Sequence, residues 1–151
     1  MLITGRLKFL QFIIYCIGQF IGAFLGAFFV WAVYFDAIQR FHNTAKSDQT
    51  IGIFGTYPSP DLSIFGGLLD QIFGTTLLII FVLAITDKKN IELPNGTGPI
   101  LVGLLIITIG TSFGVNCGYA INPARDFGPR LFTAIAGWGL KPFTNGNYFF
   151  W

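Results

Sequence analysis

Residues 116–130 read NCGYAINPARDFGPR and follow directly on an apolar run at residues 99–115. Asn is a favoured helix N-cap and Pro is favoured at the first helical position, so Asn122 and Pro123 predict the start of a helix. We expect this helix to cover about residues 122–136 and to end before a Gly-Trp-Gly break at residues 137–139. A helix of about fourteen residues is roughly 20 Å long, which is too short to cross a bilayer but reaches its middle.

Arg125 is the residue of this helix start that helix stability does not explain. A cation in the first turn faces the positive end of the helix dipole, whereas Asp126 is favoured there and can pair with Arg130 four residues on. Charged residues beside a membrane span usually line a cavity. The residues alone leave two interpretations. The favoured one is a half-helix that lines a pore, with the carbonyls of about residues 116–120 facing water or a solute, and the other is an ordinary surface loop followed by an amphipathic helix.

The composition is that of a membrane protein. Hydrophobic residues make up 53% of the 151 residues and charged residues 11%, and the mean hydropathy is +0.66. Soluble domains carry about a quarter charged residues. Long apolar runs predict three transmembrane helices, at about residues 9–35, 63–86 and 99–115. The polar stretch from residue 36 to about residue 60 predicts a long loop.

Several classes of function are disfavoured by what the sequence lacks. The net charge of +2, without a basic run, gives no reason to expect a nucleic-acid partner. Cys16 and Cys117 have neither a short spacing nor clustered His, so we expect buried free thiols, with no metal site and no cofactor. No nucleophile–base pair is evident, so we do not expect an enzyme. An ion channel or secondary transporter fits poorly, because we find no carboxylate at the centre of a span.

The stretch at residues 122–126 resembles the second Asn-Pro-Ala box of the aquaporin, or major intrinsic protein, family. Its surroundings at residues 118–120, 127–133 and 136–139 resemble the aquaglyceroporin branch, and residues 53–58 are similar to part of that branch's long third loop. The resemblance implies an all-α membrane bundle with inverted repeats, built from six helices and two re-entrant half-helices. Residues 1–151 would form one partial channel domain with the third to fifth helices and the second half-helix. The first Asn-Pro-Ala box and the sixth helix would be missing, so we expect a chain that is cut at both ends.

The resemblance also implies roles for individual residues. Arg125 would be the cation of the selectivity filter and Tyr119 its second aromatic. Gly110 stands where water-selective relatives usually carry His, which suggests a wider and less polar constriction. Asn122 would cap the half-helix and donate to the passing solute, as the first residue of the motif formed by Asn122, Pro123 and Ala124. The carbonyls that line the pore would be those of Cys117, Gly118 and Ala120.

Four further residues complete the predicted site. Asp126 and Arg130 match charged positions of the glycerol branch, although the residues alone suggest a surface ion pair that contributes little. Gln71 stands where the wider family usually has Glu, and we expect its amide to brace the re-entrant loop. Asp70, its neighbour, is interpreted as an interfacial charge and nothing more.

The function implied by the resemblance is passive conduction of glycerol and water in the full-length parent protein, with urea as a third candidate permeant. The parent would be a homotetramer in a lipid bilayer, and we expect a multi-pass protein of the plasma membrane. The alternative is a truncated, non-conducting membrane subunit that binds full-length channels and modulates them.

Overall fold

The computed structural model describes residue 5 and residues 7–44, 49–90 and 93–145. Contacts divide the chain into two compact units. The first unit is discontinuous and combines residues 1–56 with residues 122–151, whereas the second is the continuous segment 57–121. The single channel domain expected for residues 1–151 stays a prediction.

Three helices are long and apolar enough to cross a membrane: α1 (Phe9–Val33), α3 (Ile64–Thr86) and α4 (Thr97–Cys117). They confirm the three predicted spans, with ends that differ by at most two residues. The third span is longer than predicted because it begins after Gly96, whose φ of +86° forms a left-handed turn, and ends at Gly118, with φ +64°. Gly adopts this conformation without the steric cost that a Cβ would bring.

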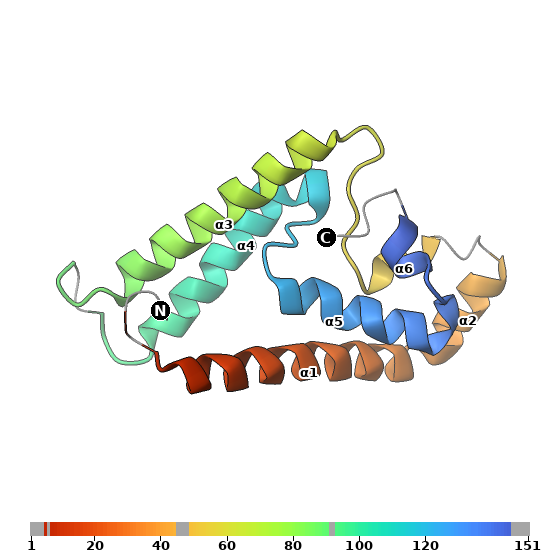
Figure 1. Cartoon of the computed structure of the whole chain (residues 1–151), viewed down its shortest axis with the longest axis horizontal. Helices are drawn as coiled ribbons and strands as arrows, with labels where there is room; N and C mark the ends of the chain where they lie inside the picture. Colours follow the sequence, from red (N-terminus) through yellow and green to blue (C-terminus); the bar gives the residue numbers. More distant parts are fainter. Residues whose placement is uncertain (1–4, 6, 45–48, 91–92, 146–151) are drawn as a thin grey trace. The chain divides into compact units, whose positions relative to one another are not determined.

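The first unit is built around α1 and the half-helix α5 (Pro123–Thr133), which lie side by side (Figure 1). Gly128 makes the close approach possible, since a Cβ at this position would lie 2.8 Å from Cβ of Ala23. At the centre of the packing lies the buried ring of Phe132. Its ring centroid is between 5.6 and 6.2 Å from those of four neighbours: Phe24, Phe28, Trp31 and Phe54.

The long loop predicted at residues 36–60 is wrong in part. A helix, α2 (Phe35–Thr44), and a 3-10 turn, η2 (Ile51–Ile53), form inside it. Two features stabilise α2. Its apolar residues recur at helical spacing, and one of them, Ile38, is buried. Asp36 lies in the first turn, where the helix dipole favours a negative charge. The polar composition of the stretch concealed this periodicity.

The half-helix α5 ends at Thr133, three residues before the predicted end at about residue 136. After α5 the chain continues into a π-helical turn, η3 (Ala134–Trp138), in which Gly137 has a φ of +124°. A short helix, α6 (Lys141–Thr144), follows. Gly137 therefore separates the half-helix from the segment that leads to α6.

The second unit pairs α3 with α4, which lie side by side (Figure 1). Ser63 caps α3, because its side chain accepts a hydrogen bond from the backbone N–H of Gly66 at 3.0 Å. Beyond α4 the chain is unusually strained: φ is positive at Tyr119 (+44°) and at Ile121 (+28°), neither of which is Gly. For a β-branched residue such as Ile121 this is a rare conformation, and the surrounding structure has to hold it.

Candidate functional site

The start of the half-helix is held by Asn122. Its backbone is extended, and its Oδ1 accepts hydrogen bonds from the backbone N–H groups of Ala124 (3.0 Å) and Arg125 (3.1 Å), while Pro123 occupies the first helical position. The cap uses the carbonyl end of the amide. The Nδ2 end is therefore the part of this side chain that can donate to a solute.

Asp126 and Arg130 form the predicted pair, but the pair is not at the surface. Arg130 Nε donates to Asp126 Oδ2 at 2.7 Å, and the side chains are 2% and 0% exposed. Asp126 Oδ1 also accepts from the backbone N–H of Thr56 at 3.0 Å and from the Thr56 hydroxyl. The Arg130 guanidinium donates to the carbonyls of Thr56 and Pro142. The interpretation as a surface ion pair is wrong, because Thr56 and Pro142 enclose both charges.

A buried hydrogen bond also fixes the loop before Thr56. Trp138 of η3 donates from Nε1 to the hydroxyl of Thr50 at 2.7 Å, and Thr50 is fully buried. Sequence reasoning missed Thr50 and Pro142 altogether. The signal for Thr56 was present in the stretch 53–58, which the resemblance had singled out without giving any residue in it a role.

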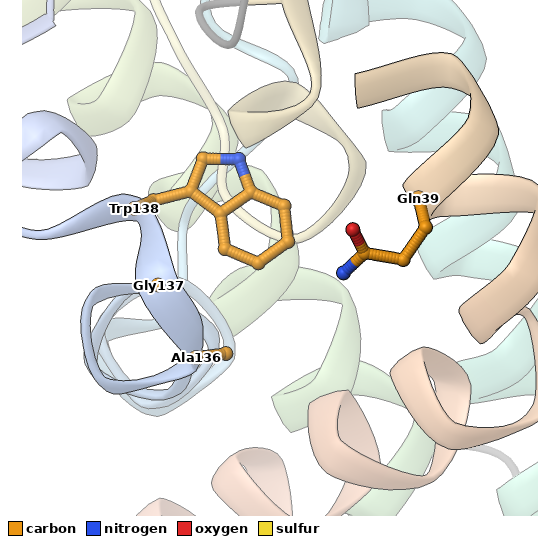
Figure 2. Close-up of a pocket in the computed structure, with 4 residues that line it drawn as sticks. All are labelled: Gln39, Ala136, Gly137 and Trp138. Atoms are coloured by element: carbon orange, nitrogen blue, oxygen red, sulfur yellow. The ribbon is translucent and has the colours of Figure 1, made fainter. Parts of the chain in front are cut away.

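A small pocket of about 110 Å³ opens beside η3 (Figure 2). Its lining comes from Ala136, Gly137 and Trp138 of η3 and from Gln39 of α2. Figure 2 shows the amide of Gln39 reaching toward the ring of Trp138. Sequence reasoning missed this pocket because it expected a loop where α2 forms.

In the second unit the ring of Tyr119 lies against α4. A Cβ on Gly110 would be 2.9 Å from Tyr119 Cζ, and a Cβ on Gly114 would be 3.3 Å from Tyr119 Cδ1. The absence of a side chain at these two positions therefore makes room for the ring. Gly110 therefore makes room for the Tyr119 ring, a role that the prediction of a wider constriction did not include.

Gln71 and Asp70 of α3 meet the segment that follows α4. Gln71 Oε1 accepts from the backbone N–H of Ile121 at 2.8 Å. Asp70 accepts from Asn116 Nδ2 at 3.0 Å and from Gln71 Nε2 at 3.3 Å, and it is 7% exposed. The interpretation of Asp70 as an interfacial charge and nothing more is wrong, since the carboxylate lies inside the unit between two amides.

The carbonyl of Asn116 has a protein partner. It accepts from the backbone N–H of Ser59 at 2.8 Å. Of the carbonyls expected to face a solute at about residues 116–120, the first is therefore engaged within the unit. The predicted set of Cys117, Gly118 and Ala120 follows it along the chain, and their role stays a prediction.

The predicted site residues fall into two groups. The first unit holds the motif Asn122, Pro123 and Ala124 together with Arg125, Asp126 and Arg130, and the second unit holds Gln71, Gly110, Cys117, Gly118, Tyr119 and Ala120. In the described part of the chain, no three His, Cys, Asp or Glu side chains come together in a way that could hold a metal ion. The chemistry that these groups offer is hydrogen bonding and charge.

The family model for the major intrinsic proteins matches residues 1–151, which is the whole chain. The chain belongs to the major intrinsic protein family. This confirms the predicted family, and the three long apolar helices confirm the predicted all-α membrane fold. Major intrinsic proteins are membrane channels, and the three long apolar helices of this chain are those of a multi-pass membrane protein.

Known members of the family are similar to this chain over nearly all of its length. Human aquaporin-9 is 45% identical over 155 residues, covering 100% of this chain and 52% of the relative, and human aquaporin-10 is 44% identical with the same coverage. Aquaporin-7 of Rattus norvegicus is 40% identical over 151 residues, covering 97% of this chain and 56% of its own length. The chain thus spans about half the length of these relatives.

A solved structure shows the same fold. The X-ray structure of the aquaglyceroporin from Plasmodium falciparum matches with a TM-score of 0.84 at 28% identity, over 97% of this chain and 58% of that one. This major intrinsic protein chain is therefore similar to an aquaglyceroporin in sequence and in backbone.

Proposed function

We propose that the whole protein to which this chain belongs is a passive channel for glycerol and water. The observation that carries the proposal is the half-helix capped by Asn122 with Arg125 in its first turn, in a chain that belongs to a channel family. Helix stability does not account for a cation at this place. A role toward a solute does, because hydroxyl groups accept hydrogen bonds from a guanidinium and from an amide.

The half-helix supplies donors and positive potential. Asn122 Nδ2 and the Arg125 guanidinium donate to hydroxyl oxygens, and the carbonyls of Cys117, Gly118 and Ala120 accept from hydroxyl hydrogens. The charge of Arg125 and the positive end of the half-helix repel protons and cations. A channel that selects neutral solutes in this way needs neither a cofactor nor an input of energy.

Tyr119 supplies the apolar side of the filter. Its ring packs on Gly110 and Gly114, so its outer face is offered to the carbon edge of a polyol. A polyol has one apolar and one hydroxyl edge, whereas water has no apolar edge. An aromatic face combined with hydrogen-bond donors therefore favours glycerol, and urea is a further permeant to test.

The remaining site residues hold these groups in place. Asp126 and Arg130 tie α5 to Thr56 and Pro142, and Gln71 braces the segment after α4 through Ile121. We place the protein in the lipid bilayer of the plasma membrane as a homotetramer. The described residues give no observation in favour of the alternative, a non-conducting subunit that modulates full-length channels.

The test places residues 1–151 in human aquaporin-9 in exchange for the matched segment. Proteoliposomes with this chimera should swell in a glycerol gradient, and Arg125→Ala should lower the glycerol flux and admit protons. A chimera that reaches the membrane as a tetramer yet conducts neither glycerol nor water would contradict the proposal.

The chain by itself is the companion experiment. We expect residues 1–151 alone to give no glycerol flux in liposomes. Flux that Arg125→Ala blocks would overturn this expectation. Co-purification of the chain with full-length aquaporin-9, together with a loss of its flux, would favour the modulating subunit.

A further inference from the structure

We propose that Asp70 is a positioning residue for the segment at residues 116–121, and that its carboxylate decides which way the Ala120 carbonyl faces. The inference deepens the proposed channel function, because this segment carries the carbonyls assigned to the solute. Nothing in the sequence alone gave Asp70 a role of this kind.

The first step is the buried position of the carboxylate. Asp70 lies in α3, one of the membrane-spanning helices, and is 7% exposed. A buried charge is costly unless hydrogen bonds serve it. Both oxygens of Asp70 are served by amides: Oδ1 accepts from Asn116 and Oδ2 accepts from Gln71. The Cys117 thiol lies against the same pair, with side-chain contacts to Asp70 and Gln71. The two amide partners, Asn116 and Gln71, show which groups the carboxylate orients.

The second step is the orientation of the Gln71 amide. An amide has a donor end and an acceptor end, and an ionised carboxylate accepts hydrogen bonds only. Asp70 therefore draws the Nε2 end of Gln71 toward itself. The Oε1 end is left to accept the backbone N–H of Ile121, at 2.8 Å. With the amide reversed, its Nε2 would face the Ile121 N–H, and two donors would oppose each other.

The third step is the peptide between Ala120 and Ile121. A trans peptide is planar, so its N–H and its C=O point in opposite directions. Fixing the Ile121 N–H toward Gln71 on α3 therefore fixes the Ala120 carbonyl on the side away from Gln71. Ile121 has a φ of +28°, which is strained for a β-branched residue, so this peptide needs an external restraint.

Two neighbouring contacts show that the restraint acts on the whole segment. Asn116, the second partner of Asp70, accepts from the Ser59 N–H at 2.8 Å through its own carbonyl. Gly74, one turn after Asp70, lets Ile121 come close, since a Cβ there would be 3.0 Å from Ile121 Cγ2. Asp70 thus holds the start of the segment through Asn116 and its end through Gln71.

The test moves the charge by one residue. Asp70→Asn removes the charge and offers a donor where the network needs two acceptors, so the Gln71 amide is free to reverse. The double variant Asp70→Asn with Gln71→Glu places an amide at position 70 and a carboxylate at position 71. The new amide would accept from Asn116 and donate to the new carboxylate, which would also accept from the Ile121 N–H. Every hydrogen bond of the network is then possible again.

The measurements use the aquaporin-9 chimera that carries residues 1–151. The first is glycerol permeability per channel at matched protein density, and the second is deuterium exchange of peptides that contain residues 116–121, which needs no activity. Asp70→Asn should lower the permeability about tenfold, the size expected for one hydrogen bond to a charged group, and should speed the exchange. The double variant should return both to within about twofold of the parent. Asp87→Asn is the matched control, because Asp87 is exposed at the other end of α3.

Each other outcome has a defined meaning. Parent-like permeability and exchange in Asp70→Asn would overturn the inference, and so would losses that the double variant does not restore, since a merely structural role would not follow the moved charge. If the parent chimera does not conduct, the proposed function fails, while the exchange measurement still decides the role of Asp70.

Discussion

Two buried polar networks, one in each unit, hold the segments that carry the proposed filter, and they use charge differently. In the first unit, Asp126 is balanced by the countercharge of Arg130, and Thr56 contacts both. In the second unit, Asp70 is served by the neutral amides of Asn116 and Gln71. The ion pair fixes where two elements meet, because each charge requires the other. The carboxylate between amides fixes a direction, because an amide can face two ways.

The largest effect should come from unbalancing the ion pair. Arg130→Met leaves the Asp126 carboxylate buried without its countercharge, which typically costs about 3–5 kcal/mol. We expect the chimera with this substitution to aggregate or to melt far below the parent, as measured by fluorescence-detected size exclusion after heating. The double variant Asp126→Leu with Arg130→Met should recover most of the loss, because no charge remains buried. Equal melting of the single variant and the parent would refute the contrast between the networks.

A smaller effect distinguishes two of the close packing contacts at glycines, those of Gly128 and Gly74. A Cβ on Gly128 would meet Ala23 Cβ at 2.8 Å and the backbone of Phe20 and Phe24 at 3.1 Å, and none of these atoms can turn away. Gly128→Ala should destabilise the protein by about 1–3 kcal/mol, the usual cost of overpacking. Gly74→Ala meets a methyl group of Ile121 alone and should cost less, while changing glycerol permeability more. The comparison fails if Gly74→Ala is the more destabilising of the two in the same melting assay.

Gly110→Ala tests whether the position of the Tyr119 ring sets the solute preference of the proposed filter. The added Cβ would lie 2.9 Å from the Tyr119 ring and push it away from α4. We expect the ratio of glycerol to water permeability to fall a few-fold, since a shift of about 1 kcal/mol changes a rate roughly fivefold. Stopped-flow light scattering on the chimera measures both solutes. The matched control is Gly103→Ala, where a Cβ meets no described atom within 4 Å.

The smallest effect concerns Trp138, which ties η3 to the loop. Trp138→Phe removes the hydrogen bond to Thr50 and should lower stability by about 1 kcal/mol beyond the loss of ring area. Trp31→Phe is the control, because its buried Nε1 has no hydrogen-bond partner among the described residues. Chemical unfolding curves of the two variants should therefore differ by that amount. Identical curves would show that the Thr50 contact adds nothing.

The sequence predicted what depends on local pattern. Apolar runs located α1, α3 and α4, and the Asn122–Pro123 signal located the start of α5. The i, i+4 spacing predicted the pair of Asp126 and Arg130. Each of these features is decided by neighbours within one or two helical turns.

What the sequence did not predict depends on distant partners. Thr56 is 70 residues before Asp126, and Asp70 is 46 residues before Asn116, so the burial of both carboxylates could not be inferred from their neighbours. Near the start of a span, Asp70 resembles an interfacial charge. The helix α2 was missed for another reason, since its polar composition outweighed a short apolar period.

The discontinuous first unit has a consequence for synthesis on the ribosome. Thr56 is made 70 residues before Asp126. At translation rates of about 5–20 residues per second this is a delay of roughly 4–14 seconds. The second unit, a continuous segment, can fold during that delay. α1 and the Thr50–Thr56 loop therefore enter the translocon without the half-helix against which they finally pack. Their contacts with Asp126, Arg130 and Trp138 can form only after this delay.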